Sequence, residues 1–474
     1  MDLVLILKTK MIASLGPSTA HPDIIREMLL LGVDCIRINF SHGEPDDWSK
    51  YIDMIRDAGK EISEASVCII GDLRGPSIRL GELDQKITIS RGSRIVFSKD
   101  PSKGVPVDSE EFFRVVDEGD LLLMDDGKLR FEVLNVKYDQ VETIALTDGE
   151  LSSRKNIHIK DKDLTSPIIS PRDYEALKIA ISKNITYIGV SHVRNRNDIE
   201  IVRRHIRSLG GSQKILAKIE NRSAVAKLDE IIEASDGVVI ARGDLGMSIG
   251  LEEVPRVQEE IVKKARARGV PVILATQLLE SMIRTPTPTR AEVQDIYTGV
   301  LMMVDALMLT GETAIGSYPL EAIKWLKRII DTSEKYYLPG LESSRLDESD
   351  RLFLRISNTD ITDKFFLGVS RLAETINATI VLFSKSGSSA YKLSKYRPRV
   401  RIVCGTNNLS VYESLKIVWG VDPVYVETDN YDEGVEKTIE KGLEKRFIET
   451  GNLVIRTYAR PQEDKYVVSI KRII

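Results

Sequence analysis

Three charged residues near the middle of the chain have the types and spacing of a metal-dependent phosphate site. Lys218 and Glu220 stand two residues apart in Leu-Ala-Lys-Ile-Glu, so their side chains point the same way on a β-strand. Asp244 closely follows the next apolar run. Carboxylates hold Mg²⁺, and a nearby ammonium can neutralise the charge of a phosphoryl group in transfer. The alternative is a buried Lys–Glu ion pair beside an Asp that caps a helix.

A second polar group ends an earlier apolar run. Arg37, Asn39 and Ser41 in Arg-Ile-Asn-Phe-Ser-His-Gly alternate with apolar residues and share one side of a strand. A guanidinium suits phosphate, and the amide and hydroxyl oxygens suit a cation. A capped turn between strand and helix explains Ser41 equally well, but it explains Arg37 poorly.

The elements that position these residues are visible in the sequence as short β-branched runs. These runs alternate with longer amphipathic segments. This alternation predicts βα units around a parallel sheet, and eight such strands predict a closed (β/α)8 TIM barrel with its chemistry beyond the carboxyl ends of the strands. The polar residues cluster at those ends. The expected strands are residues 10–15, 33–40, 67–72, 186–191, 214–220, 237–241, 271–276 and 306–310.

Two further units complete the expected architecture. Residues 76–160 are rich in hairpin signals and predict a β-barrel lid domain inserted between the two barrel parts, 1–75 and 161–337. A polar linker, 338–350, precedes a C-terminal α/β domain, 351–474, with a possible effector site. Its expected strands are 378–383, 400–404, 423–426 and 453–458.

Composition narrows the class of protein. The 67 basic residues nearly balance the 71 acidic ones, so no strong field favours nucleic acid or a membrane as a partner. Three cysteines, far apart in the sequence, form neither a disulfide framework nor a metal knuckle. The apolar stretch 3–7 is too short for a signal peptide or a membrane span. We therefore expect a cytoplasmic protein.

Six motifs, in order along the chain, resemble those of pyruvate kinases. They are residues 37–43, 71–81, 216–221, 241–246, 275–282 and 309–314. The segments Ala-Thr-Gln-Leu-Leu-Glu-Ser-Met from Ala275 and Pro-Thr-Arg-Ala-Glu-Val from Pro288 are especially similar to the helix signature of that family. The resemblance implies transfer of a phosphoryl group from phosphoenolpyruvate to ADP, giving pyruvate and ATP in the last step of glycolysis.

The resemblance also implies roles for single residues. Arg37 would contact the substrate phosphate, and Lys218 would stabilise the phosphoryl group in transit. Glu220 and Asp244 would hold Mg²⁺ or Mn²⁺. Gly243, Asp244 and Thr276 would hold the substrate carboxylate, and either Thr276 or a nearby water would protonate the enolate. The positions implied for nucleotide binding are Arg79, Lys155, Asn39 and His42, and those for a monovalent cation are Asn39, Ser41, Asp72 and Leu73.

The chain departs from the family pattern in three places. Leu73, Arg74 and Ser77 stand where potassium-dependent members usually carry Thr, Lys or Gln, and Glu, which puts the need for K⁺ in question. A positive side chain such as Arg74 could partly replace that ion. His192 stands where Phe is usual. The segment Arg154-Lys155-Asn156 lacks the Gly that usually follows in the family.

A Ser-rich turn in the C-terminal domain resembles the effector loop of the family. It comprises Ser384, Lys385, Ser386, Gly387, Ser388 and Ser389 and follows an expected strand, where a phosphate could bind. An ordinary helix start capped by Ser explains it as well. The usual C-terminal glycine-rich loop is absent, since residues 461–474 are short and charged. The resemblance further implies a homotetramer.

Two other functions fit parts of the pattern. One is a non-catalytic regulator that binds a phosphometabolite and keeps the fold without the chemistry. The other is a barrel lyase acting on phosphoenolpyruvate or pyruvate, although a lyase needs neither the long inserted lid nor a nucleotide site.

Overall fold

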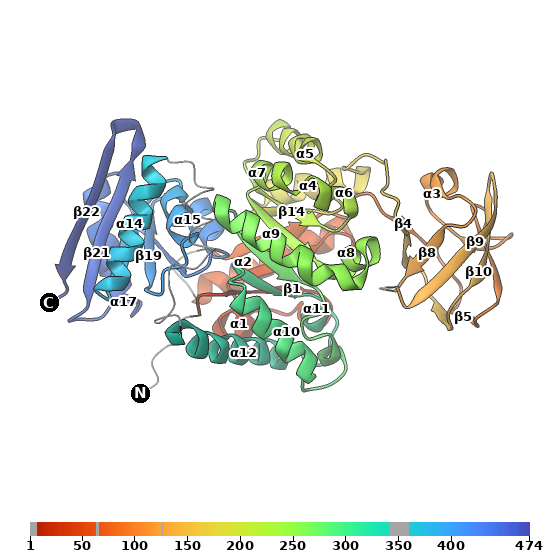
Figure 1. Cartoon of the computed structure of the whole chain (residues 1–474), viewed down its shortest axis with the longest axis horizontal. Helices are drawn as coiled ribbons and strands as arrows, with labels where there is room; N and C mark the ends of the chain where they lie inside the picture. Colours follow the sequence, from red (N-terminus) through yellow and green to blue (C-terminus); the bar gives the residue numbers. More distant parts are fainter. Residues whose placement is uncertain (1–6, 63–65, 126, 341–359) are drawn as a thin grey trace.

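Three units lie in a row along the molecule. The structure is a computed structural model that describes residues 7–62, 66–125, 127–340 and 360–474. Figure 1 shows a helix-wrapped barrel in the middle, a small β unit at one end and an α/β unit at the other. The barrel therefore has a different neighbour at each of its two mouths.

Eight parallel strands close the central barrel, as the sequence predicted. Around the barrel their order is β1, β17, β16, β15, β14, β13, β3 and β2. Nearly every strand residue is buried, because helices cover the outside and side chains fill the inside. The strands are β1 (Lys10–Leu15), β2 (Cys35–Asn39), β3 (Cys68–Asp72), β13 (Tyr187–Val190), β14 (Lys214–Ile219), β15 (Gly237–Ala241), β16 (Val272–Ala275) and β17 (Ala306–Leu309).

Amphipathic helices surround the barrel and start at recognisable caps. Ser170 and Thr289 each form a capping box with an acidic residue three positions later. The helices are α1 (Pro22–Leu30), α2 (Pro45–Ile62), α4 (Pro171–Ser182), α5 (Arg196–Ser208), α6 (Arg222–Ala226), α7 (Leu228–Ala234), α8 (Arg242–Ile249), α9 (Val254–Arg268), α10 (Arg290–Leu301), α11 (Gly311–Ala314) and α12 (Pro319–Gly340).

The inserted β unit sits at the carboxyl ends of the barrel strands. The chain leaves the barrel just after β3 and returns before α4. Edge-to-face contacts of Phe97 with Phe112 and Phe131 fill its core. Its elements are β4 (Ile78–Arg79), β5 (Ile87–Ile89), β6 (Arg94–Ser98), β7 (Val105–Pro106), α3 (Glu110–Val115), β8 (Leu121–Met124), β9 (Leu129–Lys137), β10 (Gln140–Ala145), β11 (Gly149–Leu151) and β12 (Asn156–Ile159).

The C-terminal unit is a five-stranded sheet in the order β20, β19, β18, β21, β22. The four expected strands are present and parallel, and β22 pairs antiparallel with β21 at the edge. The elements are α14 (Ile361–Thr375), β18 (Thr379–Phe383), α15 (Ser388–Ser394), β19 (Ile402–Thr406), α16 (Leu409–Leu415), β20 (Val421–Tyr425), α17 (Tyr431–Glu444), β21 (Leu453–Arg460) and β22 (Lys465–Arg472).

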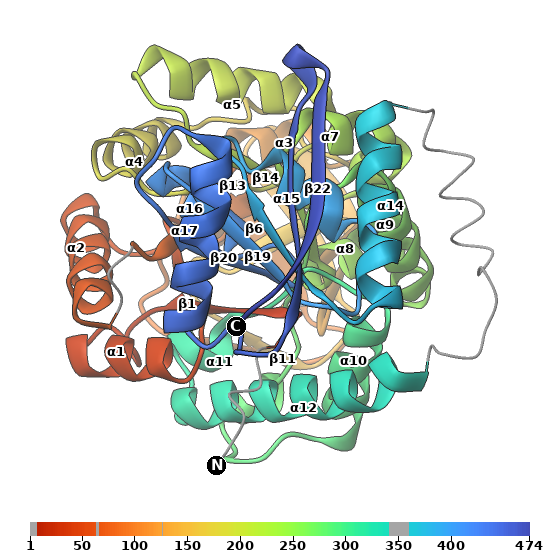
Figure 2. The ribbon, with the colours of Figure 1, turned by 90° about the vertical axis from the view of Figure 1, so that its left-hand side faces the viewer.

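The C-terminal unit closes the amino-terminal mouth of the barrel. In Figure 2 its sheet and helices stand in front of the barrel. Ile417, fully buried, packs in one apolar cluster with barrel-lining residues such as Ile12 and Leu216. Arg397 pairs with Asp305 at 2.7 Å, and the Tyr187 hydroxyl donates to the Ser414 carbonyl at 2.8 Å. Apolar contact and buried polar contact thus join the two units.

Two cysteines that are distant in sequence lie side by side in the barrel. Cys35 and Cys68 are register partners on β2 and β3, and their sulfur atoms are 2.7 Å apart as buried free thiols. Their spacing of 33 residues concealed this pairing, because it depends on which strands become neighbours.

The predicted linker 338–350 falls mostly outside the described residues, because α12 continues to residue 340 and residues 341–359 are not described. Among the helices of the described ranges, none is long and apolar enough to cross a membrane.

Candidate active site

A cavity of about 780 Å³ lies at the carboxyl-terminal mouth of the barrel, between the barrel and the inserted β unit. The structure brings together here most of the residues singled out from the sequence. Gly243 and Leu73 are not among its lining residues. Those that line it are Arg37, Asn39, Ser41, His42, Asp72, Arg79, Lys155, Lys218, Glu220, Asp244 and Thr276.

Lys218 is held by two carboxylates and a hydroxyl. Its Nζ lies 2.8 Å from Glu220 Oε1 and 3.6 Å from Asp72 Oδ2, and it donates to Ser191 Oγ at 2.9 Å. Burial alone would lower the pKa of Lys218, but the charges of Glu220 and Asp72 outweigh it, and the pKa is raised. The side chain is therefore a fixed ammonium at neutral pH.

Arg37 shares the Asp72 carboxylate. Its Nε and Nη2 both lie 2.7 Å from Asp72 Oδ2, and its Nη1 donates to Ser14 Oγ at 3.0 Å. Burial would raise the pKa of Asp72, yet Arg37 and Lys218 together lower it. One buried carboxylate thus holds two cations at the same mouth, a suitable arrangement for an anionic ligand.

Glu220 and Asp244 have the donor chemistry of a hard metal ion. Glu220 Oε2 accepts a hydrogen bond from the His192 backbone N–H at 2.7 Å, and its buried Oε1 pairs with the Lys218 ammonium. Asp244 Oδ1 lies 3.1 Å from His158 Nε2. The described residues contain no group of three side chains placed to bind a metal, so an ion here needs further oxygens from substrate or water. The two carboxylates fit such an ion.

The chain passes from β15 into α8 without a loop. Gly243 and Asp244 therefore lie in the first turn of a helix, where backbone N–H groups lack partners within the helix. The Gly243 N–H donates to Thr276 Oγ1 at 3.1 Å. Thr276 follows β16 directly with φ at +69°, a conformation that is unfavourable for a β-branched residue. This strained backbone holds the hydroxyl against the start of α8.

Of the residues expected to contact nucleotide, Arg79 and Lys155 belong to the inserted β unit, whereas Asn39 and His42 lie at the end of barrel strand β2. Lys155 Nζ lies 3.4 Å from the Asp125 carboxylate and donates to the Glu150 carbonyl at 3.0 Å. Burial, followed by the positive charge of Arg74, lowers the pKa of Arg79 to about 10. Burial and nearby arginines likewise lower the pKa of His42.

Three of the four residues expected to bind a monovalent cation, Asn39, Asp72 and Leu73, already use oxygens in hydrogen bonds or ion pairs. Asn39 Oδ1 accepts from the Ser41 N–H at 3.0 Å, and the Leu73 carbonyl accepts from the Ser191 hydroxyl at 2.8 Å. Asp72 is the carboxylate that holds Arg37. The nearby Arg74 lines the cavity and donates from Nε to Ser77 Oγ at 3.2 Å.

The Ser-rich loop expected to bind an effector lies in the C-terminal unit, away from this cavity. Lys385 pairs with Asp429 at 2.8 Å, and Ser386 Oγ donates to Ser388 Oγ at 3.0 Å. Gly387 precedes α15 with φ at +77°, which glycine adopts readily. A hollow of about 350 Å³ borders Lys385, Asp429 and Arg460.

Sequence reasoning noted Ser191 only as a polar residue at a strand end, and it missed His158. Ser191 joins Lys218 to the Leu73 carbonyl, and His158 contacts Asp244 from the β unit. Ser191 ends a predicted strand, and that position was its signal. His158 carried no such signal, because its contact depends on how the β unit meets the barrel.

Two long stretches of the chain match models of a known protein family. Residues 6–323 match the family model "Pyruvate kinase, barrel domain", and residues 365–474 match "Pyruvate kinase, alpha/beta domain". The chain belongs to the pyruvate kinase family. This membership confirms the predicted fold and makes the protein a phosphotransferase that forms pyruvate and ATP from phosphoenolpyruvate and ADP. It also implies, in general terms, dependence on a divalent metal.

Relatives cover the chain almost from end to end. A pyruvate kinase of Aeropyrum pernix is 37% identical over 98% of both chains, and one of Pyrobaculum aerophilum is 39% identical over 93% of this chain and 94% of that protein. The crystal structure of pyruvate kinase from Pyrobaculum aerophilum covers 99% of this chain and 100% of its own, with a TM-score of 0.83 and 36% identity. That of a pyruvate kinase from Cryptosporidium parvum covers 99% and 96%, with a TM-score of 0.88 and 29% identity. None of these comparisons supports the regulator or the lyase hypothesis.

Proposed function

We propose that the cavity at the barrel mouth is the catalytic site and that its residues divide the reaction between them. Arg37 binds the phosphate of phosphoenolpyruvate, Lys218 neutralises the phosphoryl group as it moves to ADP, and Arg79 and Lys155 orient the nucleotide. Phosphoryl transfer depends on positioning and on charge neutralisation more than on a covalent intermediate. The cavity supplies both through fixed cations.

The observation that carries this proposal is the environment of Lys218. Its ammonium sits among Glu220, Asp72 and Ser191 at the mouth, so it is charged and held in place before a substrate arrives. A preorganised charge stabilises a transition state without a cost of reorganisation. A structural ion pair alone would not need a second cation, Arg37, on the same carboxylate.

Glu220 and Asp244 would hold the divalent ion, Mg²⁺ or Mn²⁺. When bound there, the ion would supply Lewis-acid stabilisation of charge on the phosphate. The assignment is supported by the position of the two carboxylates, which line the same cavity beside Lys218.

Thr276 and the start of α8 would hold the substrate carboxylate. Gly243, Asp244 and Thr276 meet where orphan N–H groups and the helix dipole favour an anion. Because Thr276 Oγ1 accepts from the Gly243 N–H, it retains its own hydrogen to donate. The hydroxyl, or a water next to it, is our proton source for the enolate carbon.

The test is a coupled assay of ADP-dependent pyruvate formation from phosphoenolpyruvate with Mg²⁺. Wild-type protein should turn over, and Lys218→Met should lower kcat by orders of magnitude with little change in phosphoenolpyruvate affinity. Lys183→Met, which removes an exposed Lys paired with Asp53, is the matched control. Equal turnover in Lys218→Met would remove the role assigned to Lys218.

Four expectations stay predictions. An effector at residues 384–389 is supported by the hydroxyl-rich loop, although its Lys385 is already paired with Asp429. Partial or complete independence of K⁺ is supported by the engaged oxygens around Asp72. The family resemblance supports the homotetramer. The free thiols support the cytoplasmic location.

A further inference from the structure

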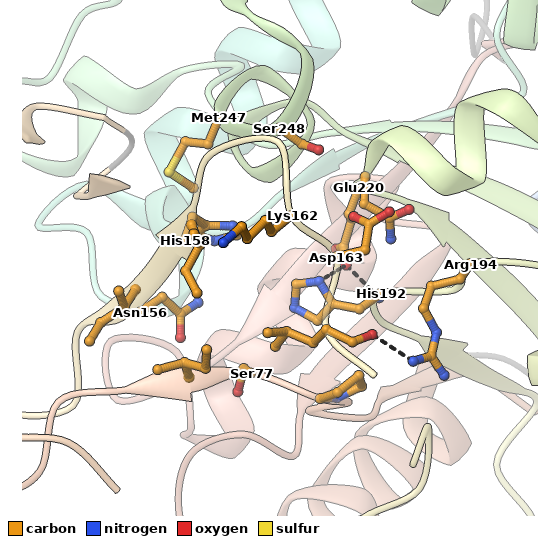
Figure 3. Close-up of a pocket in the computed structure, with 16 residues that line it drawn as sticks. Ser77, Asn156, His158, Lys162, Asp163, His192, Arg194, Glu220, Met247 and Ser248 are labelled. Atoms are coloured by element: carbon orange, nitrogen blue, oxygen red, sulfur yellow. Dashed lines mark hydrogen bonds and ion pairs between the residues drawn. The ribbon is translucent and has the colours of Figure 1, made fainter. Parts of the chain in front are cut away.

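The feature that the reaction scheme leaves unused is a pair of histidines beside the two carboxylates. His158 and His192 have ring centroids 6.3 Å apart, and each stands next to a different carboxylate. Figure 3 shows both rings, with Glu220, around a small pocket that adjoins the main cavity. They are two of only five histidines in the chain.

The two histidines do not contribute equally. His192 holds Glu220 mainly through its backbone N–H, at 2.7 Å, while its ring Nδ1 is 3.5 Å away from the same oxygen. That contact comes from a backbone N–H and does not use the ring. His158, by contrast, reaches Asp244 Oδ1 only with its side chain, through Nε2 at 3.1 Å. Replacing the ring of His158 therefore removes a contact to Asp244 that the backbone cannot supply.

His158 belongs to the inserted β unit, whereas Asp244 belongs to the barrel. His158 lies on β12, which pairs with β8 at Leu123 inside the β unit. Asp244 lies in the first turn of α8, directly after β15. The contact thus passes from one unit to the other at the edge of the cavity.

An imidazole on one carboxylate oxygen fixes the plane of that carboxylate. A hydrogen bond to Oδ1 orients Asp244 and leaves Oδ2 for another ligand. Groups that orient metal ligands in this way commonly change metal affinity by about 10- to 100-fold when they are removed. Glu220, the other carboxylate assigned to the ion, lines the same cavity as Asp244.

We propose that His158 is a positioning residue of the divalent metal site: from the inserted β unit, it holds Asp244 in the orientation that binds the ion. This inference rests on the proposed function, because it takes Glu220 and Asp244 as the metal ligands. Metal affinity in this chain then depends on a contact between the β unit and the barrel, in addition to the two carboxylates.

The test measures metal binding without turnover. Full-length protein without substrates is titrated with Mn²⁺, and the free ion is followed by electron paramagnetic resonance. His158→Leu, which removes the donor, should bind Mn²⁺ about 10- to 100-fold more weakly than wild type. His158→Gln, whose amide N–H reaches about as far, should restore most of the affinity, and a purely structural role for the ring would not produce this rescue.

Two controls separate the inference from the proposed site. His192→Phe keeps the backbone contact to Glu220 and should bind Mn²⁺ nearly as wild type does. Glu220→Gln should abolish binding. Where His158→Leu fails to fold, His158→Asn replaces it, because its shorter amide stays polar but does not reach Asp244.

Each outcome decides one of the two ideas. Unchanged or tighter Mn²⁺ binding in the Leu or Asn variant, with binding still lost in Glu220→Gln, overturns the role of His158 and leaves the metal site standing. Absence of Mn²⁺ binding in wild type, or binding that survives Glu220→Gln, overturns the metal site and this inference with it. Loss in His158→Leu with recovery in His158→Gln supports both.

Discussion

Arg37 holds Asp72 through two nitrogens, Nε and Nη2, each 2.7 Å from the same oxygen, Oδ2. The same oxygen, Asp72 Oδ2, also lies 3.6 Å from Lys218 Nζ. Asp72 is almost fully buried, so its charge is not screened by water and both cations depend on it. This pair sets the position of the Arg37 guanidinium, to which we assign the substrate phosphate, in the wall of the cavity.

Replacing Asp72 with Asn tests this dependence. Two cations would then share a site without their carboxylate, so Arg37 should shift and Lys218 should lose part of its support. We expect KM for phosphoenolpyruvate to rise about tenfold or more, with a loss of kcat, in steady-state kinetics. Asp53→Asn, which breaks an exposed pair with Lys183, should leave both constants unchanged. Wild-type constants in Asp72→Asn would contradict the arrangement.

The oxygens around Asp72 already accept hydrogen bonds or ion pairs, and this predicts little need for K⁺. Arg37 already neutralises the carboxylate, and Arg74 adds a guanidinium to the same cavity wall. Activity measured in a K⁺-free buffer with a bulky organic cation should stay within about twofold of activity with K⁺. Arg74→Met should make K⁺ stimulate the rate, because the ion would then restore lost positive charge. Strong stimulation of the wild type by K⁺ would refute the prediction.

Glu111 should make the stability of the protein depend on pH. Its buried carboxylate accepts hydrogen bonds from the backbone and hydroxyl of Thr165 and from the backbone and hydroxyl of Ser166, where the chain returns to the barrel. Burial would raise the pKa of Glu111, but these hydrogen bonds lower it below its usual 4.5. A lowered pKa adds stability above pH 4.5 that is lost as the pH falls through the lowered value.

The measurement compares Glu111→Gln with wild type by thermal unfolding across pH. The variant should be less stable by about 1–3 kcal/mol near neutral pH, because an amide cannot accept all of these hydrogen bonds. The difference should shrink below pH 4.5. A difference that stays constant down to strongly acidic pH would show that the charge of Glu111 contributes nothing.

Arg397→Met should weaken the junction between the barrel and the C-terminal unit. Arg397 and Asp305 are 5% and 3% exposed, and the substitution leaves Asp305 as a buried charge without its cation. Removing one partner of a buried pair costs about 3–5 kcal/mol, which urea unfolding would detect. Arg371→Met, which breaks a half-exposed pair with Glu374, serves as the control. Restored stability in Arg397→Met with Asp305→Asn would confirm that the unpaired charge is the cause.

The sequence predicted the barrel well because its strands are buried on both faces. Runs such as Gly237–Ala241 are apolar throughout, and the structure matches that strand residue for residue. The edge strand β22 was missed because its sequence, Lys-Tyr-Val-Val-Ser-Ile-Lys-Arg, does not alternate regularly between apolar and polar residues. Its apolar positions Val468 and Ile470 remain 45% and 52% exposed, so no strong pattern marked the segment.

The sequence predicted which residues gather at the site, but it did not predict how they pair. Lys218 and Glu220 share parity on one strand, and local geometry suffices to bring them together. Arg37 meets Asp72 only because β2 and β3 become neighbours, with Arg37 paired to Ile70 in register. His158 meets Asp244 across two units. Such contacts arise from tertiary packing, and the separation of the residues in the chain does not encode them.

The burial of Ile417 in the barrel interior has a consequence for biosynthesis. A ribosome makes the last barrel strand, Ala306–Leu309, more than a hundred residues before it makes Ile417. Until then, the amino-terminal mouth lacks a side chain that fills its core, and Asp305 lacks Arg397. The amino-terminal mouth of a nascent barrel therefore exposes apolar side chains to water. Its packing is completed only after the C-terminal unit has been translated.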